Sequence, residues 1–498
     1  MSTNVSLVYL PLLGIVALLG YVVKQWFFHP LAKYRGPFLA SLTNLWSAYL
    51  AFRGDWHVVM DQLHKKYGPI VRIAPNEVCI SDPAAMKVIY SITGGFCKSD
   101  FYEPFRIPTD PPSLFTDRDE ARHTERRRLV GSAYTMNSLL KLEPHVQIII
   151  SRFVRQLDKL FASTNEVADM STWFYRMAYD VTGQLAVGRS FNAIDEGDRF
   201  GFLSLFMDRN ANAGVLGRAP AWARPLIAPF FNTTKIQVYK DITDFMQSSM
   251  NVHLTHPEVH SDMMSLMLQL RDAKGEEVLS MDQVQRDCKS VIAAGADTTA
   301  STLAGMLHYI CKDRRVYQTL QKEIDAASLE LEADQPFSAT MTEKLPYFAA
   351  CIQEALRMHS GVGFPLPRVV PEGGAVISGE VFPEGVVVGM NAWQVHRNKD
   401  VFGEDADVFR PERWIVTNAA DRNEVQRVKN RERHQFAFGA GTRTCIGKHI
   451  SLLEVRIAIP ELMRRFDFTL EHPDRDIEVV NMWFATTRNV KCYIKARS

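Results

Sequence analysis

A glycine-rich stretch near the C-terminus, residues 436–450 (FAFGAGTRTCIGKHI), contains one cysteine, Cys445, beside three glycines and Arg443. Glycines at this density indicate that the backbone turns sharply or approaches another group closely. The residues that follow, 446–466, have the apolar spacing of a helix, so Cys445 would lie at a helix N-terminus, where the dipole and free amides stabilise a thiolate. A thiolate binds metal ions, and amides around Gly447 could tune the sulfur. The alternative is a buried structural cysteine beside a glycine turn.

A second candidate site is the stretch VIAAGADTTAST, residues 291–302. On a helix, Ala294 and Thr298 share a face because they are four residues apart. Gly295 would cost about 1 kcal/mol relative to alanine in a helix, which indicates a close approach to another group. The Asp297 carboxylate and the Thr298 hydroxyl could relay protons. The alternative is a small-residue face that only packs against another helix.

A third pattern is EALR, in which Glu354 and Arg357 are three residues apart and can pair on one helix face. Alone, such a pair is usually a solvated surface contact that contributes about 0 to 1 kcal/mol. The stretch FRPERW adds Arg413.

The cysteine stretch resembles the F-x-x-G-x-R-x-C-x-G signature of the cytochrome P450 superfamily, with the residues Phe438, Gly441, Arg443, Cys445 and Gly447. The resemblance implies that Cys445 is the axial ligand of the iron of haem b (iron protoporphyrin IX), whose electron donation favours O–O cleavage. It also implies that Phe438 and Gly447 contact the haem and that Arg443 pairs with a haem propionate.

The other two patterns match the same superfamily. The sequence A-G-x-D-T-T is its oxygen-activation motif, which implies catalytic roles for Asp297 and Thr298. Glu354, Arg357 and Arg413 correspond to a buried structural triad, whose disruption typically costs about 3 to 5 kcal/mol.

Haem propionates need cations, and the resemblance implies three more. The stretch HTERRR places His123 and Arg127 four residues apart, and LPRVV supplies Arg368. The family commonly has Trp where this chain has His123. The run of arginines 126–128 could instead be a solvated basic face, which together with Lys448 would suit docking of an acidic redox partner.

The resemblance implies a membrane-anchored haem-thiolate monooxygenase that inserts one atom of O2 into a small apolar substrate and reduces the other to water. Electrons would come from a separate NADPH–cytochrome P450 reductase, with cytochrome b5 as a further partner. The segment HPLAKYRGP and the insertion at residues 416–433 resemble filamentous-fungal members, which favours a secondary metabolite such as a terpenoid or polyketide. Oxidation of primary lipids or xenobiotics stays open.

Two other functions are weighed against this one. A haem-thiolate isomerase or dehydratase would not use O2, and such enzymes commonly lose the acid and alcohol that Asp297 and Thr298 supply here. A non-catalytic, membrane-tethered haem-binding protein would give no account of this pair.

The elements that must position these residues are mainly helical. Apolar residues recur at three- and four-residue spacing between about residues 120 and 360, and short strands are expected at residues 70–81, 373–391 and 489–496. The fold class is therefore mainly α with small β-sheets, the cytochrome P450 fold, preceded by a transmembrane helix. Pro460 is expected to kink or shorten the helix after Cys445.

Composition limits the remaining possibilities. The 498 residues are 46% hydrophobic, enough for a large core, and the net charge of +1 gives nucleic acid no reason to bind. The seven scattered cysteines form no CxxC pair, which argues against a disulfide framework or a zinc knuckle.

The N-terminus predicts a membrane anchor. The stretch Val5 to Val23 has no charged residue and is long enough, as a helix, to cross a hydrocarbon core about 30 Å thick. Lys24, Lys33 and Arg35 follow it, which places the rest of the chain in the cytosol. We expect an anchor at residues 1–28, a proline-rich hinge at 29–37 and a single haem-binding catalytic domain at 38–498. The prediction is a monomeric, single-pass protein of the endoplasmic reticulum membrane.

Overall fold

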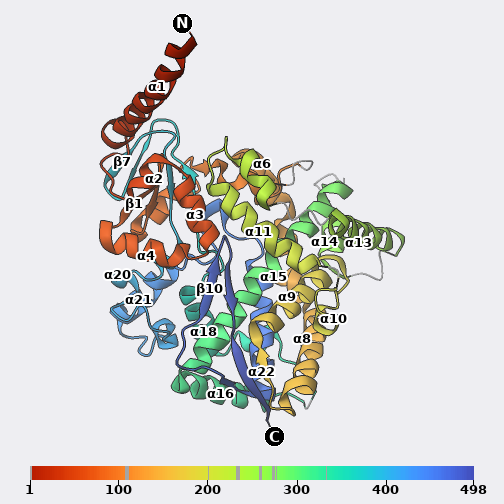
Figure 1. Ribbon diagram of the computed structural model, residues 1–498. Coiled ribbons are helices and arrows are strands. Elements are labelled where there is room, and N and C mark those ends of the chain that lie inside the picture. The colour runs from red at the N-terminus through yellow and green to blue at the C-terminus, as the bar shows by residue number, and fades with distance from the viewer. Residues whose placement is uncertain are drawn as a thin grey trace.

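The computed structural model describes residues 3–106, 111–199, 201–231, 236–256, 261–271, 275, 278–332 and 334–497. Most of the described chain is helical, and the longest helix, α15 (Met281–Lys312), runs through the middle of the molecule (Figure 1). Ser280 and Gln283 form a capping box at its start, in which each side chain accepts a hydrogen bond from the other residue's amide. The helices that pack directly on α15 include α9 (Met170–Val187), α14 (Met263–Leu268), α16 (Arg314–Ser328), α18 (Pro346–Met358) and α22 (Lys448–Arg465).

The remaining helices cover this core. In α8 (Glu143–Leu157), the apolar residues at three- and four-residue spacing, such as Val146, Ile149 and Phe153, are all buried, as amphipathic spacing predicts. The others are α2 (Phe38–Leu42), α3 (Leu45–Arg53), α4 (Trp56–Tyr67), α5 (Met86–Ile89), α6 (Glu120–Val130), α7 (Met136–Leu140), α10 (Ala193–Glu196), α11 (Phe202–Arg218), α12 (Arg224–Ile227), α13 (Ile236–Thr255), α17 (Ala339–Thr342), α19 (Ala392–Val395), α20 (Lys399–Phe402) and α21 (Arg422–Arg433).

The strands form four small sheets in the described chain. The largest has the order β1-β2-β8-β5-β3, with β1 (Ile70–Ala74), β2 (Glu77–Ile80), β8 (Val387–Gly389), β5 (Arg368–Val369) and β3 (Cys97–Lys98). The others comprise β4 (Val167–Asp169), β12 (Lys491–Ala496) and β9 (Phe466–Leu470), then β10 (Glu478–Asn481) with β11 (Ala485–Arg488), and β6 (Ala375–Ile377) with β7 (Glu380–Phe382). The predicted fold class, mainly helical with small sheets, is confirmed.

Helix α22 follows the cysteine loop, as the apolar spacing predicts. It continues through Pro460 to Arg465, so the proline does not shorten it. Of the two predicted effects of Pro460, the shortening is therefore wrong, and the kink stays a prediction.

Helix α1 (Thr3–Val23) occupies the predicted membrane anchor and projects from the rest of the molecule (Figure 1). Its side chains are described only from residue 12 on, so residues 5–11 of the predicted span lie outside the described side chains. In the part of the chain that the structure describes, no helix is both long and apolar enough to cross a membrane. The predicted transmembrane helix is therefore unsupported in the described residues.

Candidate active site

The loop that carries Cys445 is shaped by its glycines. Gly439 and Gly441 have φ values of 71° and 68°, in the left-handed region that favours glycine. A Cβ atom at Gly441 would collide with the carbonyl oxygen of Tyr90. The Cys445 amide donates to the carbonyl oxygen of Phe438 at 2.8 Å. The predicted close approach is present, but at Gly441 it is made to the backbone of Tyr90.

The Cys445 side chain lies just before α22 begins at Lys448. Burial raises the pKa of its thiol, whereas hydrogen bonds from the amides of Gly447 and Lys448 and the positive charge of Arg127 lower it. The side chain nevertheless keeps accessible surface, as expected if it faces a space inside the protein. A metal ion that binds this sulfur would displace its proton and gain from the same amides and charge.

Two buried basic side chains lie opposite each other on neighbouring strands. Lys98 of β3 and Arg368 of β5 are cross-strand partners. Arg368 donates to the Tyr102 hydroxyl at 3.1 Å, and Lys98 donates to the carbonyl oxygen of Phe115. No carboxylate among the described residues forms an ion pair with either. Burial and the neighbouring charge of Arg368 hold the pKa of Lys98 well below its usual range, so an anion bound beside the pair would favour the charged form of Lys98.

Helix α6 brings two of the predicted cofactor residues to the same place. His123 is buried, and its Nδ1 has no hydrogen-bond partner among the described residues. Burial and the charges of Arg443, Lys98 and Arg127 lower the pKa of His123 to about 3. Arg127 is half-buried, and burial lowers its pKa too, while Cys445 raises it. No described carboxylate pairs with Arg127.

Arg443 has a protein partner already. Its guanidinium donates to the Glu120 carboxylate at 2.6 Å and to the carbonyl oxygen of Asp117 at 2.8 Å. Arg443 thereby ties the cysteine loop to the N-terminus of α6. Its predicted pairing with a propionate stays a prediction, whereas Arg127 and Arg368 have no such competing carboxylate.

These observations describe a cluster of basic side chains, which we call the cation cluster after its three arginines: Arg127, Arg368 and Arg443, together with Lys98 and the neutral imidazole of His123. Burying unpaired charges and an unpartnered ring nitrogen is costly unless a ligand satisfies them. A group with two carboxylates beside an iron that accepts the Cys445 thiolate fits this donor set, and haem b is such a group. The residues present therefore fit the cofactor.

Phe438 and Gly447, the other predicted cofactor residues, lie in the same loop. Phe438 is partly buried against the main core, and the Lys448 ammonium lies 5.6 Å from the centre of its ring. Gly447 contributes its amide to the sulfur of Cys445. Their predicted contacts with haem stay predictions.

Asp297 and Thr298 point to different sides of α15. Ala294 and Thr298 share an accessible face, and the Thr298 hydroxyl donates to the carbonyl oxygen of Ala294 at 3.0 Å. Asp297 is buried and accepts a hydrogen bond from the Asn210 side chain at 3.3 Å. Burial raises the pKa of Asp297 to about 7, although the Asn210 hydrogen bond lowers it. The acid can therefore exchange a proton near neutral pH, but the two side chains form no direct hydrogen bond.

Gly295 has a different neighbour from the one expected. A Cβ atom there would lie 2.7 Å from Cγ2 of Thr182 on α9. The glycine is thus required by close packing of α15 on α9.

The predicted structural triad is confirmed. Glu354, Arg357 and Arg413 are buried, with Arg357 Nε 2.8 Å from Glu354 Oε2 and Arg413 Nε 3.3 Å from Glu354 Oε1. Burial alone would raise the pKa of Glu354, but the two arginines hold it below its usual value.

The run of arginines on α6 is not a uniform basic face. Arg126 is largely buried and pairs with buried Asp287 at 2.7 Å. Arg127 is half-buried and belongs to the cation cluster. Of the three arginines only Arg128 is exposed. The reading of residues 126–128 as a solvated face is therefore wrong for two of its three members.

Sequence reasoning missed two residues of this site, Lys98 and Asn210. Both act through partners far away in the chain, Arg368 and Asp297, and no local pattern marks either one.

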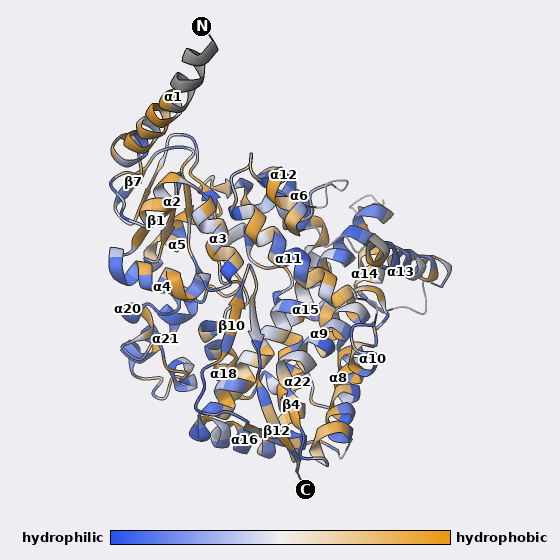
Figure 2. Cartoon of the chain, in the orientation of Figure 1, coloured by the Kyte–Doolittle hydropathy of each residue, from blue (hydrophilic) through white to orange (hydrophobic). Residues whose placement is uncertain are grey.

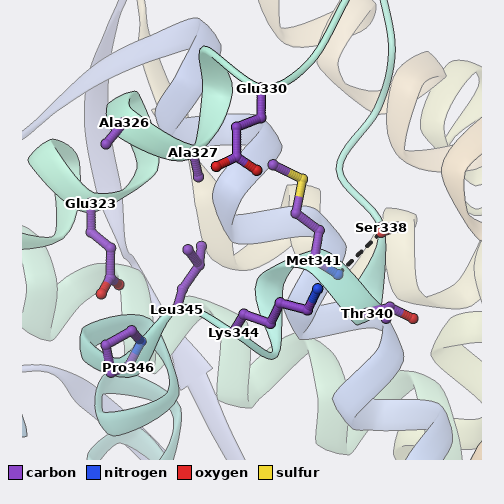
Figure 3. Close-up of a pocket in the computed structure, with 10 residues that line it drawn as sticks. All are labelled: Glu323, Ala326, Ala327, Glu330, Ser338, Thr340, Met341, Lys344, Leu345 and Pro346. Carbon is purple, nitrogen blue, oxygen red and sulfur yellow. Dashed lines mark hydrogen bonds between the residues drawn. The ribbon is translucent and has the colours of Figure 1, made fainter.

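The surface also has pockets away from the site. One of about 490 Å³ lies between α16, α17 and α18 and includes Glu323, Met341 and Lys344 (Figure 3). None of the motif residues lines it, so it does not bear on the cysteine chemistry.

Comparison with known proteins agrees with this site. A family model described as Cytochrome P450 matches residues 35–494. Cytochrome P450 monooxygenase gsfF of Penicillium aethiopicum is 36% identical over 503 residues, covering 97% of this chain and 98% of the relative. Pisatin demethylase of Fusarium vanettenii is 35% identical over 484 residues, covering 95% and 90%. Cytochrome P450 monooxygenase cicH of Emericella nidulans is 33% identical over 494 residues, covering 96% and 97%. The chain therefore belongs to the cytochrome P450 family of monooxygenases, which bind haem b through a cysteine thiolate.

Proposed function

We propose that this protein is a haem-thiolate monooxygenase in which Cys445 is the iron ligand. The observation that carries the proposal is the accessible Cys445 sulfur beside basic side chains, of which Lys98, Arg127 and Arg368 form no ion pair with a carboxylate of the described residues. Bound haem supplies the activation of O2, and the thiolate favours O–O cleavage. The side chains of the cluster hold the propionates, and Arg443 joins the cysteine loop to α6 through Glu120.

Asp297 and Thr298 handle protons in this proposal. The Asp297 pKa of about 7 lets the carboxyl group both give and take a proton at neutral pH. Because the Thr298 hydroxyl is bonded to its own helix at Ala294, a proton must pass between the two side chains through water or after a rotation of Thr298.

The substrate proposed is a small apolar molecule, a secondary metabolite such as a terpenoid or polyketide. The ring of Trp483 lies 5.3 Å from that of Phe101, 5.1 Å from Phe105, 5.9 Å from Phe115 and 6.0 Å from Phe364, measured between centroids. Phe101, Phe364 and Trp483 are buried in this cluster, whereas Phe105 and Phe115 keep accessible apolar surface that suits such a substrate.

This aromatic cluster adjoins the accessible face of α15. Gly361 lies against Thr298, since a Cβ atom there would be 3.3 Å from that of Thr298. The Gly361 carbonyl oxygen accepts from the amide of Ala485, two residues after Trp483. The similarity to pisatin demethylase and to the Penicillium and Emericella monooxygenases supports a fungal small-molecule substrate.

In this proposal, electrons come from a separate NADPH–cytochrome P450 reductase, and cytochrome b5 is a further donor. The protein acts as a monomer. Exposed Arg128 and partly exposed Lys448 offer positive charge to an acidic partner.

We also propose that α1 attaches the protein to the endoplasmic reticulum membrane, with the catalytic domain in the cytosol. The described part of α1 is mostly hydrophobic (Figure 2). The ring contact of Phe52 with Phe231 links α3 to the segment after α12. Exposed apolar side chains continue from α1 onto these elements: Leu12, Leu13, Ile15, Phe27, Phe28, Phe38, Leu39, Tyr49, Phe52, Trp222, Leu226 and Phe230. Vesicle flotation of the full chain and of a chain without residues 1–28 tests this proposal. The full chain should float with the vesicles to a greater extent than the truncated chain. Equal flotation of the two chains, or no flotation of the full chain, would contradict the proposal.

The function is tested by expressing the protein with a matched reductase under 18O2 and analysing candidate metabolites by mass spectrometry. We expect a product that forms only with NADPH and whose mass exceeds that of its substrate by one 18O atom. A rearranged or dehydrated product without labelled oxygen would indicate the isomerase or dehydratase. Haem binding with no product and no substrate-dependent NADPH consumption would indicate a carrier.

A further inference from the structure

His396 connects the structural triad to the first residue of the cysteine loop, residues 436–447. The side chain is fully buried directly after α19. Its Nε2 lies 2.7 Å from the backbone nitrogen of Phe436, and its Nδ1 lies 3.0 Å from the carbonyl oxygen of Arg357 and 3.1 Å from Oγ of Ser360.

These contacts fix which ring nitrogen carries the proton. The Phe436 amide can only donate, so Nε2 of His396 must accept and be unprotonated. The proton then resides on Nδ1, from which it is donated to the Arg357 carbonyl oxygen. Burial and the positive charge of Arg357 lower the pKa of His396 to about 3, which keeps the ring neutral and able to accept.

Arg357 of the triad also binds the backbone of His396. The Arg357 guanidinium donates to the carbonyl oxygen of His396 at 2.8 Å, so backbone and side chain of His396 are both tied to the triad. Arg357 is itself held by Glu354.

Phe436 connects His396 to the backbone that carries Cys445. Its carbonyl oxygen accepts from the Gly439 amide at 2.9 Å, and its ring lies 5.0 Å from that of Tyr90, whose carbonyl oxygen abuts Gly441. Further along, the Cys445 amide is held by Phe438. A shift of Phe436 would therefore move the backbone that carries the sulfur.

We propose that His396 is a positioning residue for the Cys445 thiolate, acting through the hydrogen bond that its Nε2 accepts from the Phe436 amide. The proposal rests on the proposed role of Cys445 as the haem ligand. It predicts that loss of this one hydrogen bond changes the ligation of the iron before it unfolds the protein.

Two substitutions of His396 distinguish the role of its Nε2 from that of its Nδ1. In H396Q the side-chain amide reaches the position of Nε2, where its oxygen can accept from Phe436. In H396N the amide reaches only the position of Nδ1, which leaves the buried Phe436 amide without an acceptor.

His359 supplies a matched control. It is equally buried, and its Nε2 contacts Ser301 at 2.9 Å, Ala485 at 3.1 Å and Thr487 at 2.9 Å instead of the cysteine loop. H359N therefore removes the Nε2 atom of an equally buried histidine that does not contact the cysteine loop.

The haem-loaded full chain and the three variants are reduced under carbon monoxide, and the fraction with the red-shifted Soret band of thiolate ligation is measured together with the thermal unfolding midpoint. We expect the ratio of displaced to thiolate-ligated haem to rise roughly tenfold in H396N, because a buried amide loses its partner. H396Q and H359N should keep the wild-type ratio, even though H359N lowers the unfolding midpoint.

Two results would overturn the proposal: a wild-type ratio in folded H396N, or an equal loss of the thiolate band in H359N, which would indicate a general effect of instability. Failure of the underlying function looks different, since the wild-type protein itself would then lack the red-shifted band.

Discussion

Asp297 and Thr298 are adjacent in the sequence but have different surroundings. Asp297 is buried beside Asn210, and Thr298 faces the accessible side of α15. In the proposed function, the site thus separates a carboxyl group that stores a proton from a hydroxyl on the accessible face of the helix. The high pKa of the acid is the cost of its burial.

This cost predicts how stability depends on pH. An exposed or unfolded aspartate ionises near pH 4, whereas buried Asp297 has a pKa of about 7. Between these values the unfolded chain releases a proton that the folded chain keeps, so Asp297 reduces stability as pH rises from about 4 and the loss levels off above about 7. Thermal unfolding midpoints of D297N should lack this part of the decline.

D208N is the control, because Asp208 is an exposed carboxylate on the neighbouring helix α11. It should keep the wild-type dependence on pH. A full wild-type decline in D297N would show that the acid is not held neutral by burial.

At the scale of elements, strand pairing places charges that no local pattern reveals. β3 and β5 bring Lys98 opposite Arg368 although the two residues are far apart in the chain. Such a pair is tolerable when an anion lies against it. In the proposed function, this sheet supplies two side chains to the cofactor site.

The pairing gives a prediction for haem binding. K98M removes a cation from the cluster, so haem should dissociate several-fold faster from this variant, as measured by transfer to a haem-scavenging apoprotein. K87M is matched in chemistry, and Lys87 is exposed on α5. An unchanged rate in K98M, or an equal acceleration in K87M, would exclude Lys98 from haem retention.

The elements also show how far sequence reasoning reaches. The helical middle and the small sheets follow from spacing, because periodicity is local. The buried triad was predictable only through the resemblance to the superfamily, since the spacing of Glu354 and Arg357 alone indicated a surface pair. The partners of Arg443, Arg126 and Asp297 could not be predicted, since Glu120, Asp287 and Asn210 meet them only in the folded chain. Gly295 was singled out correctly, but the reason, its packing on Thr182, required the neighbouring helix.

At the scale of the whole molecule, the site is assembled from four distant parts: the β3–β5 pair, α6, α15 and the cysteine loop. The charges of Arg443, Lys98 and Arg127 act on His123, and the charge of Arg127 acts on Cys445. A ligand that satisfies these charges in the folded state alone stabilises the fold by mass action. Haem retention and folding are therefore expected to be linked.

The central claim, a bond between the Cys445 sulfur and haem iron, is tested most directly by the absorption spectrum of the purified protein, reduced with dithionite under carbon monoxide. The account predicts the strongly red-shifted Soret band of thiolate ligation in the wild-type protein and its loss in C445A. A wild-type protein that retains no haem, or that shows only the unshifted band, would contradict it.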